Sequence, residues 1–407
     1  MSEPSPEVLS MAVASNRLGW HILSLLCAQE VPRAGVIISP YSIAIALAML
    51  TADAPAHERT AVFEQIGIVD ASGRSGAPEQ ARIHETCVFK DVLMEVGDAT
   101  QFLRFKDKNV LYVAAEDGVR ITRVYSALVS AFGGEHDINY PYLLYGAGPI
   151  NELFSRQTYG LIPRILAYTD LTETHVVLVS ATTLKAGWPY AFDPRNTRSE
   201  RFSSPEGMSE VEMMISCNRM IGMALEPEYL AMRLDNICDF PASLSFIAYV
   251  PRRTFTVQHI LPLMQARPPP SFGTYFVDEL GIPKFNLRCS MDLQRILEHL
   301  GYPLPENVFQ TVSRHNAVDQ MVHAAVLTHD DTGMGCPHAP APTDAPAPEL
   351  PFELKFVLFH EGLSPNAPGT PLKISALLNK TFAFSLVAED ISLALFSGVF
   401  SVAPPPS

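Results

Sequence analysis

Apolar side chains follow a helical period at the start of the chain. Between residues 8 and 26 they recur near helical spacing, after a Ser-Pro-Glu start at residues 5–7 that suits the first turn of a helix. A second helix is expected after the Ser-Pro pair at residues 39–40. Its residues 43–50 are apolar on nearly all faces, so this helix belongs in the interior of a large domain.

Short runs of β-branched and apolar residues alternate with these helical segments and predict strands. They occur at residues 36–38, 108–113, 176–184, 244–250 and 322–328. The run at 176–184 is apolar or uncharged throughout, as expected of a strand that is covered on both faces.

The end of the chain predicts a helix and a hairpin. Residues 291–300 form an amphipathic pattern that ends at Gly301, and residues 382–387 and 392–402 flank a turn at Glu389 and Asp390. Strands and helices are mixed without a regular βαβ rhythm, so the predicted class is α+β. No linker divides the chain, and we expect a single domain over residues 1–407.

A proline-rich segment separates the strand at 322–328 from the closing hairpin. Residues 334–371 hold nine of the chain's 34 prolines. Proline has no amide hydrogen and cannot donate to a sheet ladder, so the sequence indicates a loop that stays out of sheet interiors. Two short runs near its end, at 352–359 and 372–374, compete as strands of a smaller sheet.

Composition excludes several classes of function. A formal net charge of −14 with no clustered Lys and Arg argues against nucleic acid, and no heparin site is apparent. The most apolar window is too short to span a membrane. The six cysteines lack metal-ligand spacing and no catalytic motif is present, so we expect no metal, no cofactor and no enzymatic activity.

Several segments together resemble the serpin family. The motifs lie in the family's order over nearly the whole chain, at residues 39–50, 150–162, 178–197, 282–301, 379–384 and 396–400. Each motif alone is weak, but their order is specific. The resemblance implies three β-sheets, about nine helices and an exposed reactive-centre loop, here residues 334–371. In inhibitors of this family, cleavage of the loop lets it insert into the main sheet as a new strand.

The resemblance also assigns roles to individual residues. Ser39, Ser42, Ser180 and His323 would lie together beneath the region where the main sheet opens, and Trp188 would lie where insertion begins. The family usually has Asn at the position of Ser180. Without the resemblance, each of these polar residues would be read as an ordinary buried group that hydrogen-bonds to the backbone.

The segment after Gly333 departs from the family pattern. Family inhibitors have Thr or Ser and then mostly alanine here, because these side chains must fit inside a sheet. This chain instead has a hinge and loop formed by Gly333, Met334, Gly335, Cys336, Pro337, Pro340 and Pro342. With roughly 1–3 kcal/mol for each buried unsatisfied group, three prolines cost about 3–9 kcal/mol. We therefore expect insertion to be disabled or slow.

Two functions follow from these observations. The favoured one is a non-inhibitory serpin-fold monomer that binds a protein partner. The alternative is an inhibitor of serine or cysteine proteases with an atypical loop. This requires that the strain released by loop insertion exceeds the free-energy cost of placing the three prolines in the sheet. The start of the chain lacks a secretion-signal pattern, so we expect a cytoplasmic location, with unconventional secretion left open.

Overall fold

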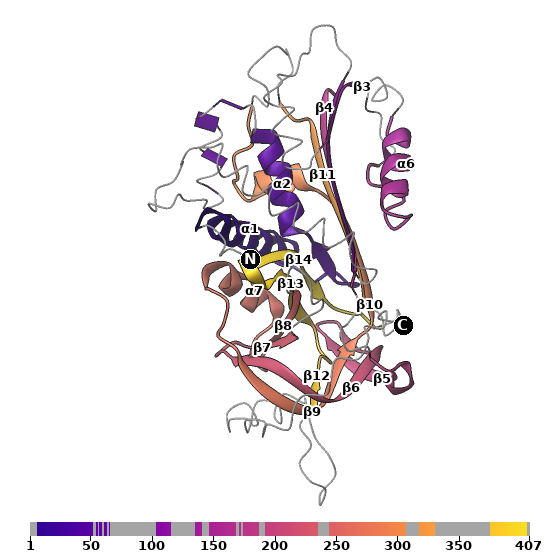
Figure 1. The fold of residues 1–407 in the computed structure, drawn as a ribbon, viewed down its shortest axis with the longest axis vertical. Coiled ribbons are helices and arrows are strands. Elements are labelled where there is room, and N and C mark those ends of the chain that lie inside the picture. Colours follow the sequence, from indigo (N-terminus) through magenta and orange to yellow (C-terminus); the bar gives the residue numbers. More distant parts are fainter. Residues whose placement is uncertain are drawn as a thin grey trace, which may run out of the picture.

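The computed structural model describes a chain of two sheets and the helices packed on them (Figure 1). The described residues are 6–51, 54–55, 57–58, 61–62, 65, 103–114, 135–140, 146–167, 171, 174–186, 192–234, 244–306, 317–329 and 375–404. The loop predicted at 334–371, together with Gly333 and Trp188, lies outside these residues.

A five-stranded sheet forms one half of the molecule. Its strand order is β10 (Phe285–Asp292), β11 (Gln320–His329), β4 (Val176–Ala186), β2 (Leu103–Ala114) and β3 (Glu135–Tyr140). The predicted strands at 108–113, 176–184 and 322–328 are confirmed as parts of β2, β4 and β11. Strand β11 runs parallel to β4, and β2 runs antiparallel to β4.

Helices cover both faces of this sheet. Helix α2 (Pro40–Thr51) lies on one face and α6 (Gly148–Gln157) on the other (Figure 1). Side chains of a strand alternate between faces, so Val177 and Val179 of β4 pack in the cluster with α6, whereas Leu178 packs in the main core with α2. This alternation decides which polar side chains of the strands point towards α2.

The other half of the molecule is a nine-stranded sheet. In spatial order its strands are β1 (Val36–Ile38), β14 (Leu393–Phe400), β13 (Phe382–Ala388), β8 (Leu244–Pro251), β7 (Tyr229–Leu234), β6 (Gly207–Leu225), β9 (Gly273–Pro283) and β12 (Ser375–Leu377), and β5 (Arg198–Ser204) pairs with β6. The predicted closing hairpin is confirmed as β13 and β14. The described strands thus form two sheets rather than three, because the 19-residue β6 pairs continuously with β7, β9 and β5.

Helices complete the α+β class that the sequence predicted. The described residues contain five α-helices, fewer than the nine expected: α1 (Pro6–Leu26), α2, α6, α7 (Val257–Ala266) and α8 (Leu293–His299). Helix α8 starts two residues later than predicted because Met291 and Asp292 still pair with β11, and the Asp292 carboxylate caps the helix by accepting from the Arg295 N–H at 3.1 Å. No helix in the described part of the chain is long and apolar enough to cross a membrane.

Candidate functional site

The two central strands of the five-stranded sheet, β4 and β11, are hydrogen-bonded directly to each other. Their parallel register runs from Gln320 opposite Val177 to Thr328 opposite Lys185. Any strand that entered between them would have to break every one of these pairs. The family resemblance predicts that the sheet opens at this seam between β4 and β11.

Four predicted polar residues meet beneath this seam. The His323 ring lies 3.1 Å from the Ser39 backbone nitrogen through Nε2 and 3.0 Å from Ser180 Oγ through Nδ1. Ser180 Oγ lies 2.8 Å from Ser42 Oγ, and all four side chains are fully buried. The sequence placed these residues together only through the family resemblance, and their role in sheet opening stays a prediction.

Hydrogen-bond directions in this group follow from the His323 ring. Its Nε2 accepts from the Ser39 N–H, so the proton of the neutral imidazole is on Nδ1 and is donated to Ser180 Oγ. Burial lowers the pKa of His323 to about 3, which keeps the ring neutral. Ser180 then donates to Ser42, whose own hydroxyl donates to Asp107 Oδ1 at 2.5 Å.

The far end of this chain of hydrogen bonds is the carboxylate of Asp107 on β2. Thr182 on β4 also donates to Oδ1 at 2.9 Å, and the amide of Asn109 donates to Oδ2 at 2.9 Å. Sequence reasoning missed Asp107, Asn109 and Thr182. Side chains of a strand alternate between its two faces, so extending the predicted strand at 108–113 back by one residue places Asp107 and Asn109 on the same face. This alternation would have found both residues.

These residues form a buried polar network that links five elements. We use this name for Ser39, Ser42, Asp107, Asn109, Ser180, Thr182 and His323. In addition to the bonds above, Ser39 Oγ donates to the Leu395 carbonyl of β14 at 2.6 Å. The network thus ties the start of α2 to β2, β4, β11 and β14. All of its side chains are buried, and separating β4 from β11 would break the bond between Ser180 and His323.

Comparison with known proteins shows which family the chain belongs to. The model of the family described as Serpin (serine protease inhibitor) matches residues 13–402. The chain belongs to the serpin family. The role of the contact between β4 and β11 in loop insertion stays a prediction.

Individual relatives agree with this assignment. The chain is 23% identical to Serpin A3-2 of Bos taurus, over 90% of this chain and 83% of that protein. It is 24% identical to alpha-1-antichymotrypsin of Homo sapiens, over 73% of this chain and 70% of that protein. Among solved structures it is similar to Arabidopsis AtSerpin1 in its native stressed conformation, with a TM-score of 0.77 and 16% identity, covering 97% of this chain and 98% of that one.

A second structural neighbour was solved with a bound ligand. Human thyroxine-binding globulin, solved with its hormone, matches with a TM-score of 0.71 and 16% identity, covering 97% of this chain and 98% of that chain. At this identity the likeness shows the fold alone. The fold and the family are established.

Proposed function

We propose that this serpin binds a protein partner and does not complete the loop insertion on which protease trapping depends. The observation that carries the proposal is the presence of Pro337, Pro340 and Pro342 in the nine residues after Gly333. Serpins are mostly inhibitors rather than enzymes, so the partner is a protein that docks on the surface or loop, and a protease is included in that class.

The length of the seam sets which loop residues would have to enter it. Strand β11 has ten residues, so a strand inserted along its full length needs about ten residues, roughly 334–343. All three prolines fall in that range. Alternate residues of an antiparallel strand bond to opposite neighbours, so Pro340 and Pro342 would fail to donate to one flanking strand and Pro337 to the other.

Both edges of the opened seam would therefore lose hydrogen bonds. Each missing donor leaves a carbonyl of β4 or β11 unsatisfied in a buried sheet, at a cost of roughly 1–3 kcal/mol and about 3–9 kcal/mol for the three. Met334 adds a second obstacle, because it stands where the family's inhibitors place a small hydroxyl residue. A slow insertion gives a trapped protease time to finish hydrolysis and leave.

A second candidate function is inhibition of a serine or cysteine protease. Two observations favour it: two relatives of this chain are named serine protease inhibitors, and a buried polar network joins β4 to β11. In this case the strain released on opening exceeds the cost of the prolines, and the loop acts as bait.

The decisive experiment measures what loop cleavage does to stability. A panel of serine and cysteine proteases is incubated with the protein, complexes are sought on denaturing gels, and the melting temperature is measured before and after cleavage. We expect no covalent complex and little gain in melting temperature. A complex that survives denaturation would overturn the proposal.

A proline variant with a matched control sharpens this test. The triple variant Pro337→Ala, Pro340→Ala and Pro342→Ala should gain heat stability after cleavage, because its loop can donate to both flanking strands. The control variant changes the prolines at the other end of the loop, Pro365, Pro368 and Pro371, to alanine, and should behave like the parent. Equal behaviour of the two triple variants would show that the prolines after Gly333 are not the obstacle.

A further inference from the structure

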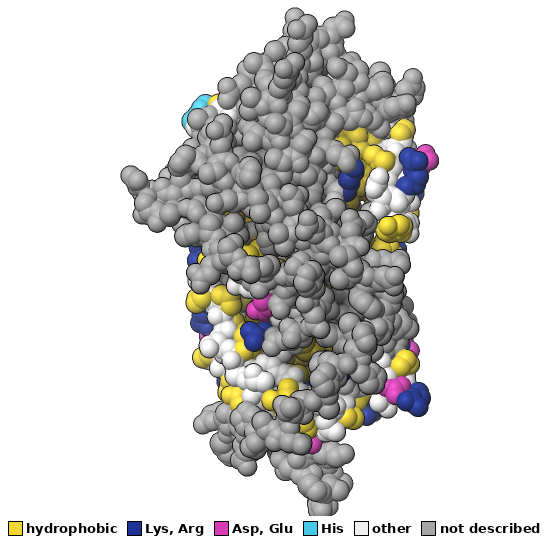
Figure 2. Space-filling model, viewed as in Figure 1, with side chains coloured by type: hydrophobic (Ala, Val, Ile, Leu, Met, Phe, Trp, Pro, Cys, Tyr) yellow, Lys and Arg dark blue, Asp and Glu magenta, His cyan; other side chains and the backbone are white. Residues whose placement is uncertain are grey.

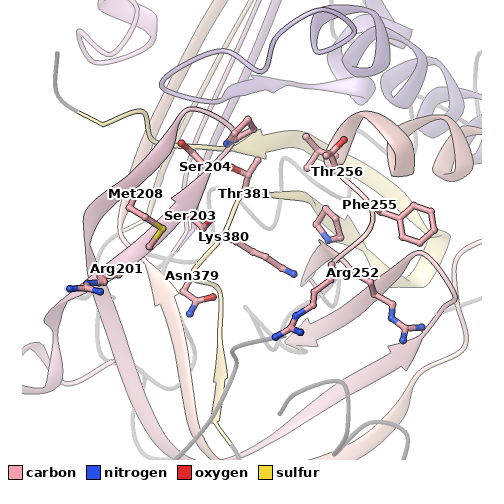
Figure 3. Close-up of a pocket in the computed structure, with 14 residues that line it drawn as sticks. Arg201, Ser203, Ser204, Met208, Arg252, Phe255, Thr256, Asn379, Lys380 and Thr381 are labelled. Atoms are coloured by element: carbon pink, nitrogen blue, oxygen red, sulfur yellow. The ribbon is translucent and has the colours of Figure 1, made fainter. Parts of the chain in front are cut away.

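A pocket lies in the nine-stranded half of the molecule, remote from the buried polar network. It encloses about 440 Å³ between the β5–β6 hairpin, the segment that leads from β8 into α7, and the link from β12 to β13 (Figure 3). This volume is within the range of sites that bind small organic molecules.

The pocket gathers positive charge on an acidic protein. Its described lining contains Arg201, Arg252, Arg253 and Lys380 and no Asp or Glu, whereas the whole chain has a formal net charge of −14. In Figure 3 Lys380 extends across the pocket towards Arg252, and Arg201 stands on the opposite side, on the hairpin. Low-dielectric walls around cations of one sign raise the local concentration of an anion.

The first turn of α7 adds to this potential. Thr256 and Val257, at the start of this ten-residue helix, line the pocket. The helix start is held by His259, whose Nδ1 lies 2.8 Å from Thr256 Oγ1 and accepts from the Thr256 N–H at 3.2 Å. The positive end of the helix dipole therefore lies at the same cavity as the four cations.

Apolar side chains form the rest of the wall. Met208 is 56% exposed at the start of β6, which is unusual for a large apolar side chain, and it lines the pocket together with Phe255, Pro205 and Pro251. A purely ionic site would not need such a surface. The lining suits a molecule with an apolar body and an acid group.

The pocket is preformed by backbone hydrogen bonds. The Ser203 N–H donates to the Asn379 carbonyl at 2.8 Å and the Thr381 N–H donates to the Ser203 carbonyl at 2.9 Å, which joins the hairpin to the link that carries Lys380. The Phe255 N–H donates to the Arg252 carbonyl at 2.8 Å on the opposite wall. A ligand would therefore bind without first ordering these walls.

We propose that this pocket binds a small amphipathic organic anion, with a carboxylate, sulfate or phosphate on an apolar, preferably aromatic, body. The acid group lies between Lys380 and Arg252, and the apolar body lies against Met208 and Phe255. This site does not depend on loop insertion, so its failure and the failure of the proposed function are separate outcomes. On the face shown in Figure 2, Lys and Arg side chains appear in several separate places, some beside Asp or Glu.

The probe for the test is 1-anilinonaphthalene-8-sulfonate, an aromatic sulfonate whose fluorescence and heat of binding are both measurable. Its uncharged counterpart, N-phenyl-1-naphthylamine, has the same aromatic body without the acid. We expect one sulfonate molecule to bind per chain. Its binding should weaken as the salt concentration rises from 0.05 to 0.5 M, because the screening length falls from ~14 to ~4 Å. The uncharged compound should bind at least about tenfold more weakly than the sulfonate.

Variants place the bound probe in the pocket. Lys380→Gln and Arg252→Gln should each weaken sulfonate binding about five- to tenfold, whereas Lys380→Arg should retain it. Met208→Ala should weaken the binding of both compounds. Arg17→Gln is the matched control, because Arg17 is an exposed cation on α1 outside the pocket. Arg201→Gln, at an exposed position, serves if a more buried variant fails to fold.

Two results would overturn the proposal. One is sulfonate binding that is the same in Lys380→Gln, Arg252→Gln and Arg201→Gln as in the parent and Arg17→Gln. The other is equal affinity for the sulfonate and the uncharged compound, which would indicate an ordinary apolar surface. Melting temperatures of the variants within a few degrees of the parent are required for either comparison.

Discussion

The two sheets of this serpin are held together by different interactions at their centres. In the nine-stranded sheet, Phe384 is fully buried, and its ring centroid lies 5.6 Å from that of Phe246 on β8. It also lies 5.5 Å from the ring centroid of Phe285, which begins β10 of the five-stranded sheet. In the five-stranded sheet the comparable position beneath β4 and β11 holds the buried polar network. One centre is an aromatic cluster, and the other is a set of directional hydrogen bonds.

This difference has a consequence for movement. Aromatic rings pack in preferred geometries inside a close-packed core, and their stabilisation is lost in proportion to the apolar surface that is exposed. A network of hydrogen bonds holds one geometry and fails when two of its elements separate. The nine-stranded sheet is therefore suited to be the fixed part of the molecule, and the seam between β4 and β11 is suited to have two discrete states, closed and open.

The largest expected effect is on the fixed part. Phe384→Ala should lower the free energy of unfolding by about 3–5 kcal/mol, because it leaves a cavity in a fully packed aromatic cluster. Denaturant unfolding measures this, and Phe384→Leu should cost less. Hydrogen exchange should rise in both sheets, since the change acts on global stability. Faster exchange confined to β4 and β11 would contradict the division between the two sheets.

A second prediction concerns pH and the His323 ring. The folded pKa of about 3 lies below the ordinary value of 6.5, so below pH 6.5 the unfolded chain binds a proton that the folded chain does not. This contribution to stability is complete above pH 6.5 and is lost as pH falls towards 3. At about 1.4 kcal/mol per unit, the loss at pH 5 is about 2 kcal/mol.

Two histidine variants isolate this effect. His323→Gln should be less stable than the parent at pH 7 and should show a flatter stability profile between pH 7 and pH 5. His299→Gln is the control, because His299 is exposed at the end of α8, and it should keep the parent's slope. The same slope in parent and His323→Gln would mean that the ring is not the group that titrates.

The third prediction compares one hydroxyl deletion in the buried polar network with one in the nine-stranded sheet. Ser42→Ala removes a donor to Asp107 and the acceptor for Ser180, at a cost of about 1–3 kcal/mol. Ser385→Ala breaks a single pair with Ser397, 3.0 Å long, in the nine-stranded sheet. Only Ser42→Ala should speed hydrogen exchange along β4 and β11. The same pattern of hydrogen exchange in the two variants would show that the buried polar network does not hold the seam closed.

Seven of the fourteen strands in the described part of the chain, and its two longest helices, could be predicted from the sequence because their apolar period is local. The run at 176–184 and the closing hairpin are set by residues that lie next to each other in the chain. The 19-residue β6 was not predicted, since its exposed and buried positions alternate irregularly and its partners β7, β9 and β5 lie at several distances along the chain. Its continuity is what turns the expected three sheets into two.

The two sites differ in how far the sequence could find them. Ser39, Ser42, Ser180 and His323 were named through family motifs. The alternation of the 108–113 run places Asp107 on the same face as Asn109, but only strand pairing shows that its carboxylate meets Thr182 of β4. The cations of the pocket were missed because each comes from a separate segment. A search for clustered Lys and Arg within one window cannot detect a cluster that only folding assembles.

The smallest expected effect tests whether the network acts through one face of β4 only. Thr182 and Thr183 are adjacent, both buried, and point to opposite faces of the sheet. Thr182→Val removes a donor to Asp107 and should cost about 1 kcal/mol, whereas Thr183→Val changes no bond of the network and should be nearly neutral. Because the two substitutions share strand, chemistry and burial, a difference between their unfolding free energies is attributable to the network. Equal costs would mean that the Asp107 carboxylate does not depend on the Thr182 donor.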